Sequence, residues 1–180
     1  MRSLKGLSIA EIAFLVCTEF DRAGVIVVLS GGAAAAVYAP QALVTRDLDF
    51  IHHLGLWAPD GTPLKNLGFA QTKSRGVYSH PDTPYTLEIL KGPLGVGDEI
   101  LNSWKTLKSE DLVLHIISPT DSIRDRLAAA IHFKDLNSAK QAAEIAKLHE
   151  VDLEVICKWC EVEGGAKTFK LFKSLLSINE

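Results

Sequence analysis

Two acidic residues set one position apart in an apolar frame are the part of the sequence best suited to chemistry. Asp47 and Asp49 alternate with Leu48 and Phe50. Because side chains alternate between the two faces of a strand, this spacing places both carboxylates on one face and both apolar side chains in the core. Neighbouring carboxylates repel each other, and a hard cation such as Mg²⁺, which prefers oxygen ligands, relieves that repulsion. The pattern predicts a metal site on a strand that runs from Asp47 to Ile51.

A pair of glycines stands upstream of these acids. An apolar run from Val25 to Leu29 predicts a buried strand, and Ser30-Gly31-Gly32 follows it directly. Glycine lets a phosphate approach the backbone closely, and the start of a helix attracts anions. No third glycine follows at the G-x-G-x-x-G spacing, so the segment is not a dinucleotide-binding fingerprint. Ser30, Gly31 and Gly32 are therefore candidates for lining a phosphate group.

The elements around these motifs predict an α+β protein. Ser8 and Glu11 form a capping box that opens a helix, and Gly24 ends it. The other expected elements are an Ala-rich helix over 33–39, a short helix around 64–68, an antiparallel pair of strands over 77–80 and 85–90, and a buried strand over 112–117. Only helical patterns follow Ser118, with breaks near Asn137, Asp152 and Gly164-Gly165. We expect a mixed sheet flanked by helices over residues 1–117 and a C-terminal helical lobe over 118–180 that packs on it.

Charge and hydropathy narrow the class of protein. The formal net charge is −3, with 19 basic against 22 acidic residues, which argues against a broadly basic nucleic-acid surface. Ser30-Gly31-Gly32 interrupts the longest apolar stretch, which is also shorter than the ~18 residues typical of a membrane span. Glu11 interrupts the apolar core that a secretory signal would need. We expect a cytoplasmic protein without a membrane partner.

The cysteines follow no disulfide or zinc framework. Cys157 and Cys160 form a C-x-x-C pair within the helix expected over 152–163, and no second pair stands at a spacing suited to zinc. Reduced, partly buried thiols are the interpretation that fits this pattern.

The order of these elements resembles the nucleotidyltransferase superfamily with the DNA polymerase β-like fold. In that order, a strand leads to Gly-Gly, a helix follows, and Asp-x-Asp lies on the next strand. Gly31-Gly32 and Asp47-Leu48-Asp49-Phe50 match its signature. The family's third carboxylate lies on a neighbouring strand, and Glu88 is the best candidate here, although many relatives have aspartate there. In the helical half, Asp125-Arg126-Leu127 and Lys134-Asp135 resemble small bacterial nucleotidyltransferase-like proteins, which include toxins of toxin–antitoxin and abortive-infection systems.

The resemblance implies transfer of a nucleotidyl group from a nucleoside triphosphate to a hydroxyl. Asp47 and Asp49 would hold two Mg²⁺ ions, and Glu88 would hold the catalytic ion and help deprotonate the acceptor. Ser30, Gly31 and Gly32 would line the triphosphate, and Arg46 and Lys91 are candidates for meeting its charge. The acceptor is an RNA end, a protein side chain or a small molecule, and a cognate partner protein would help to recognise it.

Other interpretations of the same residues remain open. The fold would also serve a non-catalytic module, such as one half of a toxin–antitoxin pair, or a scaffold in which the acids are incidental. Arg124 and Arg126 lie near a helix start, where cations are disfavoured, so they have either a specific task or a surface pairing with Asp125 or Asp121. Of the three tryptophans, Trp57, Trp104 and Trp159, we expect packing roles rather than platforms for bases.

Overall fold

A seven-stranded mixed sheet forms the centre of the protein, whose computed structural model describes residues 3–42, 44–53, 55 and 59–177. The strand order is β3-β4-β5-β2-β1-β9-β8, and β6 and β7 form a separate hairpin. The strands are β1 (Val27–Ser30), β2 (Asp47–His52), β3 (Ala70–Gln71), β4 (Val77–Ser79), β5 (Thr86–Lys91), β6 (Gly95–Val96), β7 (Glu99–Ile100), β8 (Lys105–Ser109) and β9 (Leu112–Ile116).

The middle of the sheet mixes two strand directions. β1 pairs antiparallel with β2, whereas β5 runs parallel to β2 and β9 runs parallel to β1. β4 continues the sheet as an antiparallel neighbour of β5, as the alternation over residues 77–90 predicts. The end of β1, the start of β2 and the start of β5 therefore meet at one edge of the sheet.

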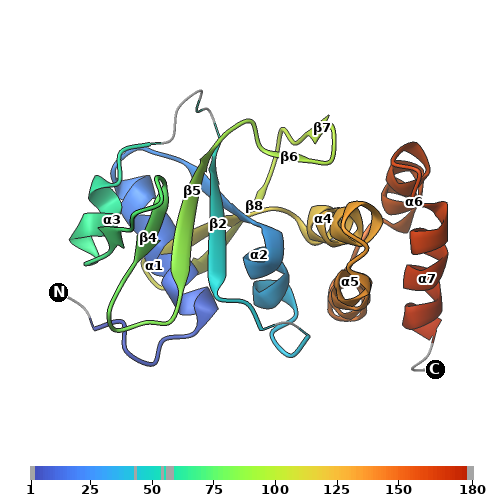
Figure 1. Ribbon diagram of the computed structural model, residues 1–180, viewed down its shortest axis with the longest axis horizontal. Coiled ribbons are helices and arrows are strands. Elements are labelled where there is room, and N and C mark those ends of the chain that lie inside the picture. The colour runs from blue at the N-terminus through green and yellow to red at the C-terminus, as the bar shows by residue number, and fades with distance from the viewer. Residues whose placement is uncertain (1–2, 43, 54, 56–58, 178–180) are drawn as a thin grey trace.

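Seven helices lie within the described ranges. They are α1 (Ile9–Arg22), α2 (Gly31–Tyr38), α3 (Thr62–Asn66), α4 (Pro119–His132), α5 (Leu136–Leu148), α6 (Leu153–Val162) and α7 (Ala166–Leu176). α1 opens with the expected capping box of Ser8 and Glu11. Figure 1 shows α2 between the sheet and the group α4–α7, which stands to one side of it. The mixed α+β architecture, with helices flanking the sheet, confirms the fold class expected from the sequence.

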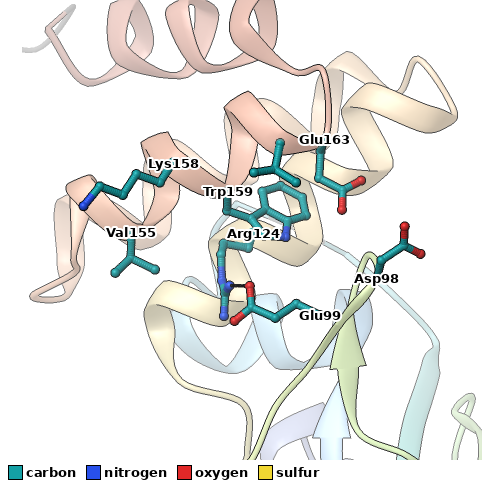
Figure 2. A pocket seen from close by; sticks show the side chains of 8 residues that line it. Asp98, Glu99, Arg124, Val155, Lys158, Trp159 and Glu163 are labelled. Carbon is teal, nitrogen blue, oxygen red and sulfur yellow. Dashed lines mark hydrogen bonds and ion pairs between the residues drawn. The ribbon is translucent and has the colours of Figure 1, made fainter.

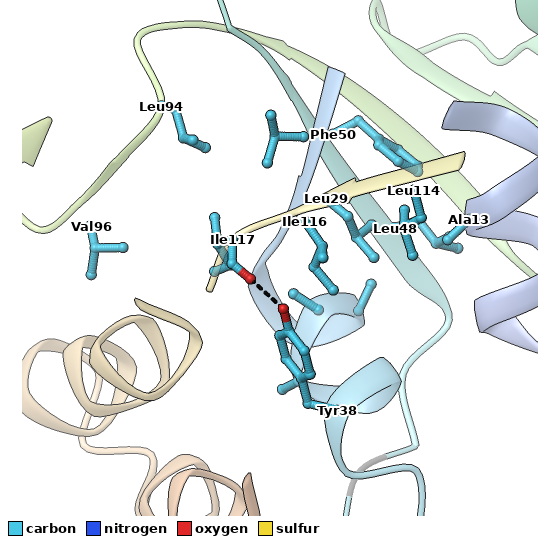
Figure 3. Packing of buried hydrophobic residues seen from close by; sticks show 14 of the residues in the cluster. Ala13, Leu29, Tyr38, Leu48, Phe50, Leu94, Val96, Leu114, Ile116 and Ile117 are labelled. Atoms are coloured by element: carbon cyan, nitrogen blue, oxygen red, sulfur yellow. Dashed lines mark hydrogen bonds between the residues drawn. The ribbon is translucent and has the colours of Figure 1, made fainter. Parts of the chain in front are cut away.

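One apolar core joins the sheet to the helices. Leu29 of β1, Phe50 of β2 and Ile116 of β9 are fully buried, and the same cluster extends to residues of α4, α5, α6 and α7. Figure 3 shows these side chains around β1, with the Tyr38 hydroxyl donating a hydrogen bond of 2.7 Å to the carbonyl of Ile117. This bond fixes the end of α2 against the end of β9.

Some elements differ from the sequence-based expectation. The sequence pattern does not predict the β6–β7 hairpin or strands β3 and β8, and the short helix begins at Thr62 rather than near Leu64. Ser30 ends β1 and also caps α2, without a side-chain hydrogen bond to it. The breaks in the helical half agree with the sequence, since Asp152 is the N-cap of α6 and Gly164-Gly165 separates α6 from α7.

All three cysteines are free thiols, with Cys17 and Cys160 buried and Cys157 half-buried. None of the helices in the described ranges is long and apolar enough to cross a membrane.

Candidate active site

The strand register places two of the predicted acids directly beside each other. Asp49 of β2 and Glu88 of β5 are paired across parallel strands, and Asp47 pairs with Thr86 in the same ladder. Side chains of paired residues on adjacent strands point to the same face, and residues two apart on one strand do so as well. Asp47, Asp49 and Glu88 therefore share a face of the sheet.

The opposite face of these strands belongs to the core. Leu48 and Phe50 of β2 and Leu87 and Ile89 of β5 are all buried. The alternation that seals these apolar side chains leaves the carboxylates exposed or half-buried, with Asp49 among the half-buried ones. Apolar packing thus fixes the direction of the acids.

Asp49 is the carboxylate whose ionisation the surroundings change most clearly. Burial is the largest cause that raises its pKa from the ordinary 3.8 to about 6. The negative charges of Glu88, Asp47 and Asp125 also raise this pKa, in that order, and the positive charge of Arg126 lowers it. Asp47 is exposed and accepts a hydrogen bond from the Thr86 hydroxyl. The repulsion between these carboxylates is therefore seen in the raised pKa of Asp49.

The glycine pair starts α2 against this carboxylate. Gly31 has a φ of +64°, a left-handed conformation that L side chains rarely adopt. A Cβ at this position would lie 2.8 Å from Oδ2 of Asp49, so any side chain here would force the Asp49 carboxylate to shift. Ser30 is buried and pairs with Asp49 across β1 and β2, while Gly32 follows in the first turn of α2. The first turn of α2, where backbone N–H groups attract anions, therefore begins beside the acids.

Helix α4 contributes two charged residues that sequence reasoning did not assign to the site. Asp125 Oδ2 accepts hydrogen bonds from Arg126 Nε at 3.0 Å and from Arg126 Nη2 at 2.6 Å. Both residues act on the pKa of Asp49 through space, and their side chains are only 22% and 16% exposed. The sequence does contain a signal for a role of Arg126: a cation near the start of α4 is disfavoured by the helix dipole. From the sequence we could expect Arg126 to pair with Asp125, but not that this pair lies near β2.

The two predicted phosphate-binding cations differ in position. Arg46 is exposed and immediately precedes Asp47, and its carbonyl accepts a hydrogen bond from the Thr86 N–H. Lys91 pairs with His52, three residues beyond Glu88 along β5. Strand alternation directs its side chain to the face opposite Glu88. The register therefore argues against Lys91, whereas Arg46 precedes β2 and its place in the site stays a prediction.

The donor set suits a hard cation, but its oxygens are not gathered around one point. Carboxylates of Asp47, Asp49 and Glu88 are the ligand type that Mg²⁺ prefers. Within the part of the chain that the structure describes, no three His, Cys, Asp or Glu side chains form a group able to hold a metal ion. Like charges repel, so a bound cation would be what brings these carboxylates together.

Comparison with known proteins identifies the fold. No protein-family profile matches the sequence, and no curated protein matches it. Among solved structures, the chain is similar to an antigenic nucleotidyltransferase-like protein from Paracoccidioides brasiliensis, with 13% identity and a TM-score of 0.64 over 97% of this chain and 94% of that one. The antibiotic-resistance factor ANT(2'')-Ia matches with 14% identity and a TM-score of 0.47 over 93% of this chain and 94% of that one. The first likeness shows that the protein has a nucleotidyltransferase-like fold.

Proposed function

We propose that the protein is an Mg²⁺-dependent nucleotidyltransferase that moves a nucleoside monophosphate from a nucleoside triphosphate to a hydroxyl acceptor. The observation that carries this proposal is the pairing of Asp49 with Glu88 on adjacent strands, next to the glycine start of α2. Carboxylates that could hold a cation and a helix start that attracts phosphate thus lie together on the nucleotidyltransferase-like fold.

In the proposed reaction, an acceptor oxygen forms a bond to the α-phosphorus, the bond to the bridging oxygen breaks, and pyrophosphate leaves. Asp47 and Asp49 would hold the metal ions, which when bound neutralise charge on the phosphate oxygens. Glu88 would bind a metal ion and accept the proton of the acceptor hydroxyl. Backbone N–H groups at Gly31 and Gly32 would orient the triphosphate, with Ser30 beside them.

The pair on α4 extends this assignment. The positive charge of the Arg126 guanidinium already lies within electrostatic reach of Asp49. We assign it to the triphosphate, together with the exposed Arg46. Asp125 would hold Arg126 in place through its two hydrogen bonds, which makes it a positioning residue.

A transfer assay with radiolabelled triphosphates, Mg²⁺ and total cellular RNA, protein or small molecules tests the proposal. Removal of a group that stabilises developing charge costs on the order of a hundredfold or more, so Asp49→Asn and Glu88→Gln should each abolish transfer. Asp111→Asn is the matched control, because its carboxylate is 77% exposed and makes only a 3.5 Å contact with Arg22. Equal turnover in Asp49→Asn and Asp111→Asn would contradict the assignment.

A non-catalytic binding module in the same fold, for instance a toxin–antitoxin component in the cytoplasm, is the second candidate. The observation that favours it is the lack, among the described side chains, of a three-ligand group ready for metal. A ligand that binds only the folded state raises its stability by RT ln(1 + [L]/Kd), about 2.7 kcal/mol at a hundred times Kd. A triphosphate that stabilises the wild type only with Mg²⁺, and that fails to stabilise Asp49→Asn, would favour the enzyme. Mg²⁺-independent stabilisation without turnover would favour the module.

A further inference from the structure

A cavity of small-molecule size lies between the β6–β7 hairpin, α4 and α6. Its volume is about 480 Å³, within the ~300–1,000 Å³ range of ligand pockets. The lining contains none of the carboxylates that the sequence assigns to the proposed active site. Figure 2 shows the lining, which consists of Asp98, Glu99, Arg124, Val155, Lys158, Trp159, Val162 and Glu163.

One side of α6 gives the cavity its apolar surface. Val155, Trp159 and Val162 are spaced by four and then three residues, so they lie on the same side of the helix. Trp159 is buried, whereas Val155 is 40% exposed and Val162 is 86% exposed. The two valines therefore leave apolar surface in contact with water, and a ligand that covered this surface would gain from its burial.

The turn of the β6–β7 hairpin brings two carboxylates of the lining close together. Gly97, which precedes Asp98 in this turn, has a φ of +58°, and a Cβ there would collide with Oε1 of Glu163. The Glu163 carboxylate thus packs directly against the turn that carries Asp98. Figure 2 shows both carboxylates on the same side of the Trp159 ring.

The two cations of the lining are already matched by carboxylates. Arg124 pairs with Glu99 within the lining and with Asp121 outside it. Lys158 pairs with Glu154, which also lies outside the lining. An anionic ligand would therefore find no free cation in this cavity.

Asp98 and Glu163 have no such cation. Asp98 is exposed and makes no hydrogen bond or ion pair with any residue in the described part of the chain. Glu163 Oε2 lies 3.0 Å from His132 Nε2, and this ring is charged only when it is protonated. In and around the lining, carboxylates outnumber cations whether or not His132 carries the additional proton.

We propose that this cavity, the α6 pocket, binds a small organic ammonium ion with an apolar body. The body would cover Val155 and Val162, and the ammonium would lie between the carboxylates of Asp98 and Glu163. An ammonium has only hydrogen-bond donors and a carboxylate has only acceptors, so the two groups match. The same pair of negative charges would repel an anion. This proposal does not rest on the proposed transferase activity.

Calorimetric titration of the full-length protein with three probes of similar shape tests the preference for positive charge. Phenethylamine is a cation at neutral pH, phenethyl alcohol is neutral and phenylpropionate is an anion. The amine should bind saturably, the alcohol about tenfold more weakly, and the anion not detectably. Spermidine carries more positive charge but no apolar ring, so it should bind more weakly than phenethylamine.

Variants of the lining locate the bound amine. Asp98→Asn should raise the Kd of phenethylamine about threefold, because exposed ion pairs contribute modestly. Val162→Lys adds a cation to the lining at an 86% exposed position, so it should keep the fold and raise Kd about tenfold. Asp111→Asn is the matched control, because it removes an exposed carboxylate that does not line the cavity.

Thermal melts of each variant establish that it folds before its Kd is interpreted. Failure of phenethylamine to bind up to its solubility limit would overturn the proposal, as would equal binding of the amine and the alcohol. Tighter binding of spermidine than of phenethylamine, or equal effects of Asp98→Asn and Asp111→Asn, would also contradict it. All titrations are made without nucleotide or Mg²⁺, so failure of the α6 pocket is distinguishable from failure of the transferase.

Discussion

At the scale of single residues, Asp49 makes the stability of the protein depend on pH. Its pKa is raised from 3.8 to about 6 in the folded state, mainly by burial and then by Glu88. The folded state thus binds the proton more tightly than the unfolded chain, so the contribution of Asp49 to stability falls as pH rises from about 4 to about 6.5. Two units correspond to at most about 3 kcal/mol, and partial solvation of the side chain reduces this to about 1–2 kcal/mol.

We therefore predict that Asp49→Asn is more stable than the wild type at pH 7 and that this advantage vanishes near pH 4. Urea unfolding of both proteins between pH 4 and pH 8 gives the difference between their free energies of unfolding. The titration of groups that the two proteins share cancels in this difference. Asp47→Asn should show a smaller effect, since Asp47 is exposed and its carboxylate accepts a hydrogen bond from Thr86. A constant difference between wild type and Asp49→Asn at every pH would show that Asp49 does not titrate in this range.

Gly31 offers a second test at the residue scale. Gly31→Ala introduces two costs, a left-handed backbone for an L residue, about 1–2 kcal/mol, and a Cβ that approaches Asp49 Oδ2. Gly24→Ala is the matched control, because Gly24 has a φ of +73° but nothing lies within 4 Å of its Cβ. Unfolding free energies should fall more for Gly31→Ala than for Gly24→Ala, and only Gly31→Ala should weaken stabilisation by a triphosphate. Equal losses would mean that Asp49 moves aside freely.

At the scale of elements, an ion-paired cluster ties α4 to the β6–β7 hairpin. Arg124 has a side chain that is only 5% exposed, and it pairs with the 13%-exposed Asp121 and the 55%-exposed Glu99. Removal of one partner from a buried pair costs about 3 kcal/mol, whereas an exposed pair contributes less than about 1 kcal/mol. Thermal or urea unfolding should therefore show a large loss for Asp121→Asn and a small one for Glu99→Gln. The reverse order would assign the main attachment of Arg124 to the hairpin.

The elements that the sequence predicted are those whose side-chain pattern repeats locally. β2 and β5 alternate between buried and solvent-facing residues, and α1 carries its own capping signal. β8, by contrast, is an edge strand with the sequence KTLKS and mostly exposed side chains, and it exists because β9 supplies its hydrogen bonds. β6 and β7 have two residues each, too few for any periodicity.

The same difference between local patterns and long-range contacts decides which residues of the site could be predicted from the sequence. Asp47, Asp49 and Glu88 could be found because alternation determines their face. The proximity of Asp125 and Arg126 to Asp49 could not, since it depends on how α4 packs against the sheet, a contact between residues far apart in the sequence. Lys91 is a candidate because it lies close to Glu88 in the sequence. Its register with His52 shows that its side chain points to the face opposite Glu88.

At the scale of the whole molecule, the core crosses the boundary expected near Ile117. Buried side chains from the sheet, such as Leu48, belong to the same apolar cluster as Leu127 of α4 and Phe172 of α7. The division into residues 1–117 and 118–180 stays a prediction about lobes rather than about independent folding units. Unfolding should be one cooperative transition, with coincident curves by far-ultraviolet circular dichroism and tryptophan fluorescence. Two separated transitions would show that the helical lobe folds alone.

The burial of two of the three thiols has a practical consequence for spectroscopy. Burial raises the pKa of Cys17 and of Cys160 to about 12, so neither forms the thiolate that alkylating reagents require. Cys157 and Cys160 both line a cavity of about 400 Å³ between α6 and α7, but of the two only Cys157 is partly exposed, so it should accept a maleimide label alone. Intact-mass spectrometry should show one adduct on the native protein and three after denaturation. That result would give the unmodified chain a single attachment point for a fluorophore or spin label, on the helix that also bears Trp159.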